Sequence, residues 1–425
     1  MTEKKKKGKI RKAKGMHDIF GKEYSLQEKV LEKARTIADF YGFRPVQIPH
    51  LEKTELFTTT VGENTDIVEK EMYNLKTKGG EQLVLRPELT APLVRAYIEN
   101  GMHTKTQPIM WYSFGSCFRY ERSQKGRRRE FQQFDLEILG EQDSIADAIV
   151  IKIALSILED LLGTDSVSVK INSVGDKECR KEYTKELVSY YKKNIKSICK
   201  NCERRLKTNP LRLLDCKEEK CGEIKKGAPQ IINCLCDGCT KHFKDVLEIL
   251  DASNVPYYLD HYLVRGLDYY SRTAFEIVDE KSGEALCGGG RYDSLAKILN
   301  GKDIPGVGMA MGINRVVDLM IEQGKKPPKP KAPKIFFIQL GAGAKYKSLS
   351  ILEILRKSKI PTKHSLSKNS LRDQLSTASK LSVPFAIIFG QKEAMEDTVI
   401  VRNMETASQE TIPIEKLLDY LKKKI

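Results

Sequence analysis

The spacing of apolar residues divides the chain into helical and strand-like segments. Apolar positions recur every three or four residues from Ser25 to Tyr41, which predicts an amphipathic helix that ends at Gly42. Residues 43–52 follow as an extended segment. Another helix is expected from about Ser144, and it leads into a strand at 166–176. Helices and strands therefore mix along the first half of the chain.

Residues 117–140 hold the most informative pattern. An Arg-Tyr-Glu-Arg block enters a basic turn, and polar residues then alternate with apolar ones. The apolar positions are Phe131, Phe134, Leu136 and Ile138, and the polar ones are Gln133, Asp135 and Glu137. This period predicts two antiparallel strands with one buried face, which present arginines and carboxylates around a cationic loop. Such a surface suits a substrate with a polyphosphate at one end and a polar or cationic group at the other. A solvated basic hairpin is the alternative, which the interleaved glutamates and glutamine disfavour.

Shifts in composition indicate where the domains begin and end. Residues 179–250 are rich in lysine and cysteine and look inserted, while 324–334 form a proline- and lysine-rich spacer. Segments 257–279 and 285–299, between the insertion and the spacer, are strand-like. The last ninety or so residues alternate strand and helix, which predicts a small α/β domain with a mixed or parallel sheet. The expected divisions are a basic tail (1–14), a core in two parts (15–178 and 251–323), an insertion (179–250), a linker (324–333) and a terminal α/β domain (334–425).

Charge and hydropathy narrow the class of protein. The chain has 425 residues, enough for two or three domains. Its 73 basic and 57 acidic residues give a formal charge of +16, which favours a polyanionic partner, although a lysine-rich proteome would produce the same excess. No run approaches the ~18–20 apolar residues that cross a bilayer. The basic amino terminus lacks the apolar stretch of a secretory signal, so we expect a cytoplasmic protein without membrane contact.

Seven of the ten cysteines lie between residues 199 and 239. They form the close sets Cys199 and Cys202, Cys216 and Cys221, and Cys234, Cys236 and Cys239. Such spacing fits tetrahedral thiolate sites for structural Zn²⁺, for which the candidate ligands are Cys199, Cys202, Cys216, Cys221, Cys236 and Cys239. Buried free thiols and a redox role are the alternatives, and a disulfide framework is not expected. Cys117, Cys179 and Cys287 are interpreted as small core residues.

Several blocks together resemble one family, histidyl-tRNA synthetase, within the class II aminoacyl-tRNA synthetases. FRPVQIPHLE (43–52), FRYERSQKGRRREF (118–131) and GVGMAMGINRVV (306–317) are similar to the three class II motifs. LVRGLDYYSRTAFE (263–276) and CGGGRYDSL (287–295) resemble blocks particular to the histidine family, and KGMHD, LRPELTA and NPLRLLDCK agree with it. The resemblance spans nearly the whole chain.

The resemblance implies an α+β fold: a class II antiparallel catalytic sheet flanked by helices, with an inserted subdomain and a C-terminal α/β anticodon-binding domain. It implies a histidine–tRNA ligase that activates L-histidine with ATP and Mg²⁺, releases pyrophosphate and transfers histidine to the 3′ end of tRNA(His). GAGAKY (341–346) is a weak glycine match, interpreted as a turn and not as a dinucleotide site. Helices and strands of the first motif imply a homodimer, with about 25–50 in the interface.

The resemblance also assigns roles to individual residues. Arg119 and Arg265, each expected within an apolar strand, would hold the α-phosphate of ATP as catalytic residues. The other ATP-binding candidates are Glu121, Arg127, Phe131 and Arg315. The histidine-binding candidates are Glu88, Leu89, Thr90, Gln133, Glu137, Tyr269 and Tyr270, and Tyr292 is expected to line the same pocket. The tRNA-binding candidates are Arg122, Gln124 and Lys125 at the acceptor end and the loop 364–369 at the anticodon.

Some positions depart from the family pattern. Asn314 stands where glutamate is common before the arginine of the third motif, and Asp135 stands where glycine is common beside the histidine pocket. We expect Asn314 to change the orientation of Arg315 and Asp135 to alter the pocket charge. Two alternatives stay open: a catalytically silent regulatory relative of the family, and an RNA-binding module without chemistry. An intact RGLDYY block and a terminal α/β domain favour the ligase.

Overall fold

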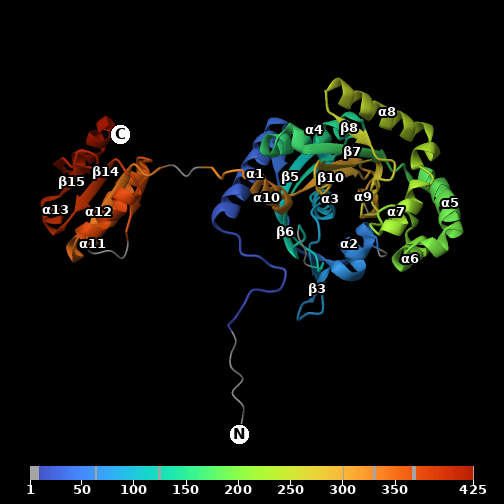
Figure 1. Ribbon diagram of the computed structural model, residues 1–425, viewed down its shortest axis with the longest axis horizontal. Coiled ribbons are helices and arrows are strands. Elements are labelled where there is room, and N and C mark those ends of the chain that lie inside the picture. Colours follow the sequence, from blue (N-terminus) through green and yellow to red (C-terminus); the bar gives the residue numbers. More distant parts are fainter. Residues whose placement is uncertain are drawn as a thin grey trace, which may run out of the picture. The chain divides into compact units, whose positions relative to one another are not determined.

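A computed structural model describes residues 9–62, 65–122, 126–299, 301–328, 332–365 and 370–424. The chain divides into two compact units, Met1–Pro327 and Pro328–Ile425 (Figure 1). Each unit has a sheet and a hydrophobic core of its own. Among the described residues, none of the helices combines the length and the apolar character needed to span a membrane.

A large sheet organises the first unit. Within the described residues it has eight strands, which lie side by side in the order β1-β5-β6-β11-β10-β9-β7-β8. Their bounds are β1 Arg44–Pro45, β5 Ile109–Phe118, β6 Glu130–Leu139, β11 Gly306–Gly312, β10 Ala285–Arg291, β9 Ser271–Asp279, β7 Val167–Ser173 and β8 Tyr257–Leu259. Neighbouring strands are antiparallel except at the two edges, where β1 and β8 run parallel to their neighbours. The predicted antiparallel catalytic sheet is confirmed.

The predicted hairpin of residues 117–140 is confirmed, but its burial differs from the prediction. β5 and β6 are antiparallel, with Cys117 opposite Phe131. The alternation predicted one buried face, whereas β6 is buried on both: Asp135 and Glu137 are as inaccessible as Leu136. The apolar side of β6 packs in the core with the helices, and α3 contacts the strand on its polar side. The polar residues of β6 therefore belong to a site and not to a solvated face.

Long apolar helices cover one side of this sheet. They are α1 (Gly21–Phe40), α4 (Ile145–Leu162), α8 (Asp237–Ala252) and α10 (Ile313–Glu322). Figure 1 shows α1, α4 and α10 beside one another, and their buried side chains join those of the strands in one core. The predicted helix at 25–41 is present but begins four residues earlier, at Gly21. Apolar burial thus fixes the sheet against a helical layer.

Shorter elements surround the opposite side. A small sheet has the strand order β2-β4-β3, with β2 Leu51–Lys53, β4 Gln82–Leu85 and β3 Tyr73–Lys76. The helices here are α2 (Thr54–Val61), the π-helix η1 (Ile67–Glu71), α3 (Thr90–Glu99) and α9 (Leu295–Ile298), with the single turn η2 (Met102–Thr104). Another single turn, η3 (Thr164–Ser166), follows α4 and contacts it. α3 contacts β6, so its first turn lies against the polar side of that strand.

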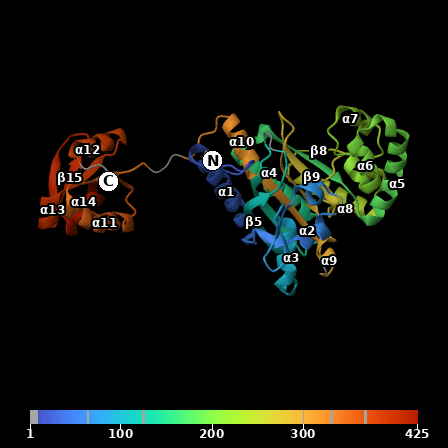
Figure 2. The ribbon, with the colours of Figure 1, turned by 90° about the horizontal axis from the view of Figure 1, so that it is seen from below.

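The cysteine-rich segment forms a helical group with its own core. The chain leaves the sheet after β7, and it returns through α8 to β8, which pairs with β7. Between these strands lie α5 (Lys177–Lys193), η4 (Ile195–Ser197), α6 (Lys200–Thr208), η5 (Pro210–Leu213), α7 (Glu219–Lys226) and η6 (Ile231–Cys234). Figure 2 shows α5, α6 and α7 together at one end of the first unit. Tyr183, Leu187 and Tyr191 are buried at the centre of this group.

Two strand predictions were wrong in part. Residues 257–279 are strands only at β8 and β9, and Arg265 lies in the irregular loop 260–270 between them. Arg119 follows the last residue of β5 instead of lying within the strand. Both arginines line the same cavity from a loop and from a strand end. Binding residues often lie on such segments, which a rigid sheet positions.

The second unit is the expected small α/β domain. Its strands lie in the order β13-β12-β14-β15-β16, of which the first three are parallel and the last two antiparallel. Their bounds are β12 Ile335–Gln339, β13 Thr362–His364, β14 Phe385–Phe389, β15 Thr398–Asn403 and β16 Gln409–Pro413. The helices are α11 (Ala342–Lys357), α12 (Leu371–Lys380), α13 (Gln391–Glu396) and α14 (Leu417–Lys424), with η7 at Ile414–Lys416.

The segment GAGAKY is not the predicted turn. Only Gly341 lies outside a helix, with a φ of 84° at the start of α11, and residues 342–346 are helical. The glycines had suggested a turn, but Ala342, Ala344 and the residues after them favour helix. The helix packs Ala344 into the domain core.

Candidate active site

An open cavity lies over β6, β10 and β11 beside the loop 260–270. It has a volume of about 860 Å³, part of which is open to solvent. Arg119 after β5, Arg127 and Arg315 at the start of α10 line it together with Arg265. Phe131 and Gln133 contribute from β6. We call the four arginines Arg119, Arg127, Arg265 and Arg315 the arginine side of the site.

Arg119 is held between a carbonyl group and a ring. Its Nε donates to the carbonyl oxygen of Pro87 at 2.9 Å. Its guanidinium carbon lies 5.2 Å from the ring centroid of Phe131, a cation–π distance. Both contacts leave the positive charge without a carboxylate directly bonded to it among the described residues. An oxyanion entering the cavity can supply that missing negative charge.

Arg265 is fixed by a carboxylate and by a glycine. Its Nη1 donates to Glu276 of β9, and its guanidinium carbon lies 5.8 Å from the ring centroid of Tyr270. A Cβ atom at Gly288 would come within 2.3 Å of Arg265 Nη1, so glycine at this position of β10 leaves the guanidinium room to lie where it does. Burial works to lower the pKa of Arg265, but the nearby charge of Glu276 outweighs it and the pKa is raised. The guanidinium therefore stays charged.

The other two arginines gather at the outer end of the cavity. Arg127 Nη1 donates to Glu121 Oε2 at 3.1 Å. Arg315 donates through Nε to the carbonyl oxygen of Gly126 at 3.1 Å and through Nη1 to that of Ala285 at 2.7 Å. Burial, and then the repulsion of Arg127, lower the pKa of Arg315. Crowded positive charge of this kind favours an anionic ligand.

Buried carboxyl groups lie on the polar side of β6. We call Glu88, Asp135 and Glu137 the carboxyl side of the site. Glu88 accepts from the backbone N–H groups of Thr90 at 2.7 Å and Ala91 at 2.9 Å, at the first turn of α3. The hydroxyl of Thr90 donates to Glu137 Oε1 at 2.7 Å, and that of Tyr292 donates to Glu137 Oε2. Thr90 thus links two carboxyl groups.

The pKa values of all three carboxyl groups are raised. Burial raises the pKa of Glu137 to about 8, although the Tyr292 and Thr90 hydroxyls oppose the shift. Burial also raises the pKa of Glu88. The pKa of Asp135 is shifted well upward, first by burial and then by Glu137 and Glu88, and both its oxygens lack a hydrogen-bond partner among the described residues. A cationic ligand would relieve this repulsion.

Three tyrosines enclose the carboxyl side. The ring centroids of Tyr269 and Tyr270 are 4.8 Å apart, and those of Tyr269 and Tyr292 are 5.8 Å apart. The hydroxyl of Tyr269 donates to Glu88 Oε2 at 3.4 Å. Aromatic faces with inward hydroxyls suit a flat ligand ring that carries polar atoms.

Gly308 of β11 is a site residue that the sequence reasoning missed. A Cβ atom there would lie 1.6 Å from Glu137 Oε2. β11 pairs Gly308 directly with Glu137, so only glycine leaves room for the carboxyl group to turn into the pocket. The glycine was visible in GVGMAMG, but its partner on β6 depends on register. Glu276, which holds Arg265, was missed for the same reason.

Most predicted site residues come together, and a few do not. Leu89 is buried among Ile48, Leu93 and Cys117 in an apolar cluster. Gln133 accepts from Cys117 Sγ at 3.0 Å and lines the cavity. Arg122 is exposed, whereas Gln124, Lys125 and residues 366–369 lie outside the described residues.

The two departures from the family pattern have different consequences. The Oδ1 of Asn314 accepts from the backbone N–H of Gln132 at 2.6 Å. Arg315 is oriented by the carbonyl groups of Gly126 and Ala285 instead. Asn314 therefore holds the start of α10 to β6 and does not bond Arg315. Asp135 adds a third buried carboxyl group beside Glu88 and Glu137.

The cysteines of the insertion form two separate groups. Cys199, Cys202, Cys216 and Cys221 bring their sulfur atoms within 4.8 Å of one another. The second group is Asp176, Cys179, Cys236 and Cys239. Cys179 is buried, as the interpretation as a core residue expects, and its sulfur also lies beside the start of α8. Cys117 and Cys287 are buried among core residues as expected.

Comparisons with known proteins agree with this geometry. A family model described as histidyl-tRNA synthetase matches residues 15–316, and one described as anticodon binding domain matches 334–424. A histidine–tRNA ligase of Caldicellulosiruptor bescii is 42% identical over 419 residues, which cover 98% of this chain and 99% of that protein. One from Clostridium perfringens is 36% identical over 406 residues, which cover 96% and 97%.

Solved structures give the same result. The crystal structure of apo S. aureus histidyl-tRNA synthetase matches with a TM-score of 0.77 at 31% identity and covers 97% of this chain and 99% of that one. A Bacillus halodurans protein described as an ATP phosphoribosyltransferase regulatory subunit/histidyl-tRNA synthetase matches with a TM-score of 0.62 at 19% identity over 91% of this chain and 99% of that one, a likeness of fold alone. The chain belongs to the histidyl-tRNA synthetase family.

Proposed function

We propose that this chain activates L-histidine with ATP, releases pyrophosphate, and transfers histidine from the adenylate to the 3′ end of tRNA(His). The observation that carries the proposal is that β6 belongs to both sides: Phe131 and Gln133 line the cavity of the arginine side, and Asp135 and Glu137 of the carboxyl side follow at alternate positions of the same strand. One side suits the phosphates of a nucleotide and the other suits a small cationic ligand with a polar ring. Relatives that share 42% of its residues over nearly the full chain are described as histidine–tRNA ligases.

In the activation step, a carboxylate oxygen of histidine bonds to the α-phosphorus while the bond to pyrophosphate breaks. Negative charge grows on the α-phosphoryl oxygens, and fixed guanidinium groups stabilise it. We assign this stabilisation to Arg119 and Arg265. Arg119 follows β5 and Arg265 precedes β9, and these two strands lie on either side of β6, β11 and β10 in the sheet.

The remaining nucleotide contacts follow the outer end of the cavity. Arg127 and Arg315 would bind the outer phosphates, and Glu121 would contact the nucleotide beside them. Phe131 would stack on adenine. The family uses ATP with Mg²⁺, which neutralises phosphate charge and orients the leaving group when bound.

The histidine contacts follow the carboxyl side. The α-ammonium group would bind at Glu88, Thr90 and Gln133. Glu137 would accept from one imidazole nitrogen, because each of its oxygens has a second lone pair beyond the bond that Thr90 or Tyr292 uses. Tyr270 would bond the other ring nitrogen. The packed ring of Tyr269 lines the pocket, and Leu89 supports it from the core.

The second unit would bind the anticodon, and Arg122, Gln124 and Lys125 would approach the acceptor end. An anticodon-binding family match at 334–424 and the net charge of +16 support a tRNA partner.

We also propose a homodimer through about 25–50, a cytoplasmic location, structural metal in the cysteine-rich insertion, and the six-part domain division predicted above. Light scattering that gave an active monomer at micromolar concentration would contradict the dimer.

An ATP–pyrophosphate exchange assay over all twenty amino acids tests the activation step. Exchange should depend on histidine alone, because two buried polar anchors for one ring are left unpaired by apolar analogues. Exchange with another amino acid would overturn the substrate, and exchange with none would favour a silent regulatory relative. Charging of tRNA transcripts with labelled histidine then tests the transfer step.

A further inference from the structure

The insertion and the residues next to it contain two groups of metal-type ligands, one in the middle of its chain and one where its two ends meet. The first is the all-cysteine group, Cys199, Cys202, Cys216 and Cys221. The second is the root group, Asp176, Cys179, Cys236 and Cys239. Each group offers four ligand atoms that lie within 4.8 Å of one another. The six cysteines of the sequence prediction thus divide between two sites, and Asp176 and Cys179 complete the second.

The all-cysteine group has the dimensions of a tetrahedral thiolate site. The sulfur atoms of Cys199 and Cys216 are 3.8 Å apart. A tetrahedron with metal–sulfur bonds of about 2.3 Å spaces its sulfurs by about 3.8 Å. A disulfide needs about 2.05 Å. Backbone N–H groups of Cys202 and Cys199 donate to sulfur atoms within the group, which stabilises thiolates.

The root group joins the two ends of the insertion. Asp176 and Cys179 lie at the start of α5, and Cys236 and Cys239 lie at the start of α8. The Cys236 N–H donates to Cys179 Sγ at 3.1 Å, and Cys236 Sγ donates to Asp176 Oδ2 at 3.6 Å. Zinc accepts a carboxylate oxygen beside thiolates. An ion here closes a loop of about sixty residues, which removes conformational freedom from the unfolded insertion.

The all-cysteine group also lies next to the candidate active site. Cys199 and Cys216 line a second cavity, of about 1020 Å³, whose other walls include Arg119, Arg127 and Arg315. Cys202 is on α6, which also carries Arg204 and Arg205, and Cys216 follows η5, which carries Arg212. Cys199, Cys202 and Cys216 therefore lie on or next to the short helices that carry the arginines.

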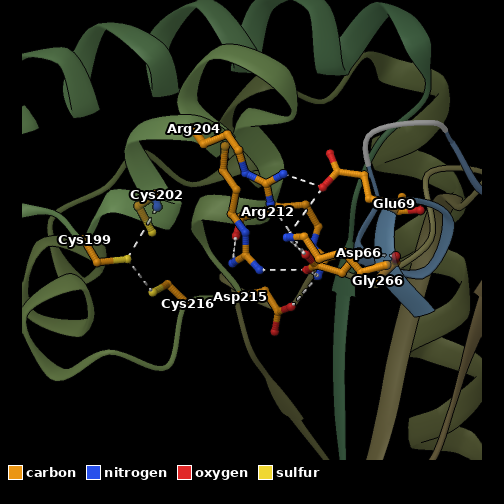
Figure 3. A network of polar contacts seen from close by, with 12 residues as sticks. Asp66, Glu69, Cys199, Cys202, Arg204, Arg212, Asp215, Cys216 and Gly266 are labelled. Carbon is orange, nitrogen blue, oxygen red and sulfur yellow. Dashed lines mark hydrogen bonds and ion pairs between the residues drawn. The ribbon is translucent and has the colours of Figure 1, made fainter. Parts of the chain in front are cut away.

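These arginines bond two segments of the catalytic core (Figure 3). Arg205 Nη2 donates to Asp66 Oδ2 at 3.1 Å, and Arg204 donates to Glu69 of η1. Arg212 donates to the carbonyl oxygen of Gly266 at 2.9 Å and to Asp66 at 3.4 Å.

Each of the two segments is linked to an arginine of the arginine side. Gly266 is the residue after Arg265. The carbonyl oxygen of Glu71, at the end of η1, accepts from the backbone N–H of Tyr120, the residue after Arg119.

We propose that the insertion binds two Zn²⁺ ions, one in the all-cysteine group and one in the root group, and that the first ion positions Arg119 and Arg265 through Arg204, Arg205 and Arg212. The root ion holds the insertion closed, and the ion of the all-cysteine group holds its arginines in register with Asp66 and Gly266. The three arginines are positioning residues. The metal sites stand independently of the proposed function, and the coupling to catalysis rests on it.

Metal content of the full chain tests the two sites. Protein purified with a reducing agent should contain two equivalents of zinc by elemental analysis. Cys202→Ser and Cys239→Ser should each lose one equivalent, whereas Cys234→Ser should keep both, because Cys234 belongs to neither group. Wild-type protein without zinc, or a Cys239→Ser variant that keeps two equivalents, would overturn the proposal.

A second measurement covers variants that fail to fold. Wild-type protein reconstituted with Co²⁺ should show the intense visible bands of tetrahedral thiolate coordination, and Zn²⁺ should displace them. Asp176→Asn, the mildest change to the root group, should weaken Co²⁺ binding at one site and leave the bands of the all-cysteine group unchanged. Cobalt spectra typical of octahedral oxygen ligands would overturn the thiolate assignment.

The coupling is tested by kinetics at constant metal content. Arg205→Gln should keep two zinc equivalents and lower kcat for pyrophosphate exchange by about tenfold, within the range of residues coupled in one network. Lys200→Gln, which removes the same charge from an exposed position of α6, should change nothing. Asp66→Asn should give at least as large a loss, because Arg212 also donates to Asp66. The double variant Arg205→Gln with Asp66→Asn should lose no more than Asp66→Asn alone.

The failures of the two proposals can be told apart. Additive losses in the double variant, or normal kcat in Arg205→Gln, would overturn the coupling and leave the metal sites intact. If wild-type protein with two zinc equivalents showed no exchange with any amino acid, the proposed function would fail and the metal sites would stand.

Discussion

The arginine side and the carboxyl side of the site share strand β6 but satisfy their charges differently. Arg119 and Arg315 are held by the carbonyl oxygens of Pro87, Gly126 and Ala285, so their positions are fixed while their charge is left for a ligand.

On the carboxyl side, burial raises the pKa of Glu137 to about 8. Burial also raises the pKa values of Glu88 and Asp135. The arginine side is therefore positively charged and in place before an anion binds. On the carboxyl side, burial disfavours the charged carboxylate form, and a bound cation would stabilise that form.

The largest effect should follow from changes on the arginine side. Arg265→Lys or Arg119→Lys should lower kcat for pyrophosphate exchange by about 10²–10³-fold, because an ammonium cannot reproduce a two-point guanidinium contact in the transition state. Histidine binding, measured by calorimetry, should change little. Arg95→Lys, a matched change at an arginine paired with Glu52 and Glu99, serves as the control. Near-normal exchange would remove that arginine from the mechanism.

Removal of the second unit should leave both sides of the site working. A chain truncated after Pro333 should keep most of its histidine-dependent exchange and lose most of its tRNA charging. Its tRNA affinity should also depend less steeply on salt, because fewer phosphates are neutralised. Charging and salt dependence equal to those of the full chain would contradict an anticodon role for this unit.

Changes on the carboxyl side should affect histidine more than ATP. Glu137→Gln keeps the shape but not the anionic acceptor, so KM for histidine should rise by about 10–100-fold, which corresponds to one lost charged hydrogen bond. KM for ATP should stay within about twofold. Gly308→Ala should have a similar effect, because its Cβ would displace the same carboxyl group. Equal losses for the two substrates would place Glu137 outside the histidine pocket.

The smallest effect should be a pH-dependent change in stability. Glu137 has a folded pKa of about 8, above its ordinary 4.5, so the folded chain retains a proton that the unfolded chain releases between these values. Its contribution to folding is therefore full below pH 4.5 and is lost as the pH rises toward about 8. Glu137→Gln should raise the Tm of the ligand-free chain, by more at pH about 9 than at pH about 6. A difference independent of pH would contradict the raised pKa.

The hairpin shows how far local pattern extends. The alternation in 131–138 predicted β6 and its pairing with β5 correctly, because strand period is a property of neighbouring residues. The same pattern predicted one buried face and favoured a substrate-binding surface on the other, but it did not show that this polar face is buried as well. Whether a polar face meets water or a pocket depends on what packs against it, and α3 comes from residues 90–99. Similarly, Arg265 was expected in a strand, but neighbouring apolar residues could not show that the chain loops there.

By itself, the sequence determined the family, the antiparallel core and the terminal α/β unit, because motif residues stand in fixed local order. The roles of the individual site residues stay predictions. Only the tertiary structure decided which residues meet across strands. Gly308 faces Glu137 through the β11–β6 register, and Glu276 of β9 holds Arg265 of the preceding loop. Asp176 and Cys179 lie beside Cys236 and Cys239, some sixty residues further along the chain. Such contacts depend on register and chain return, which apolar spacing along one segment does not encode.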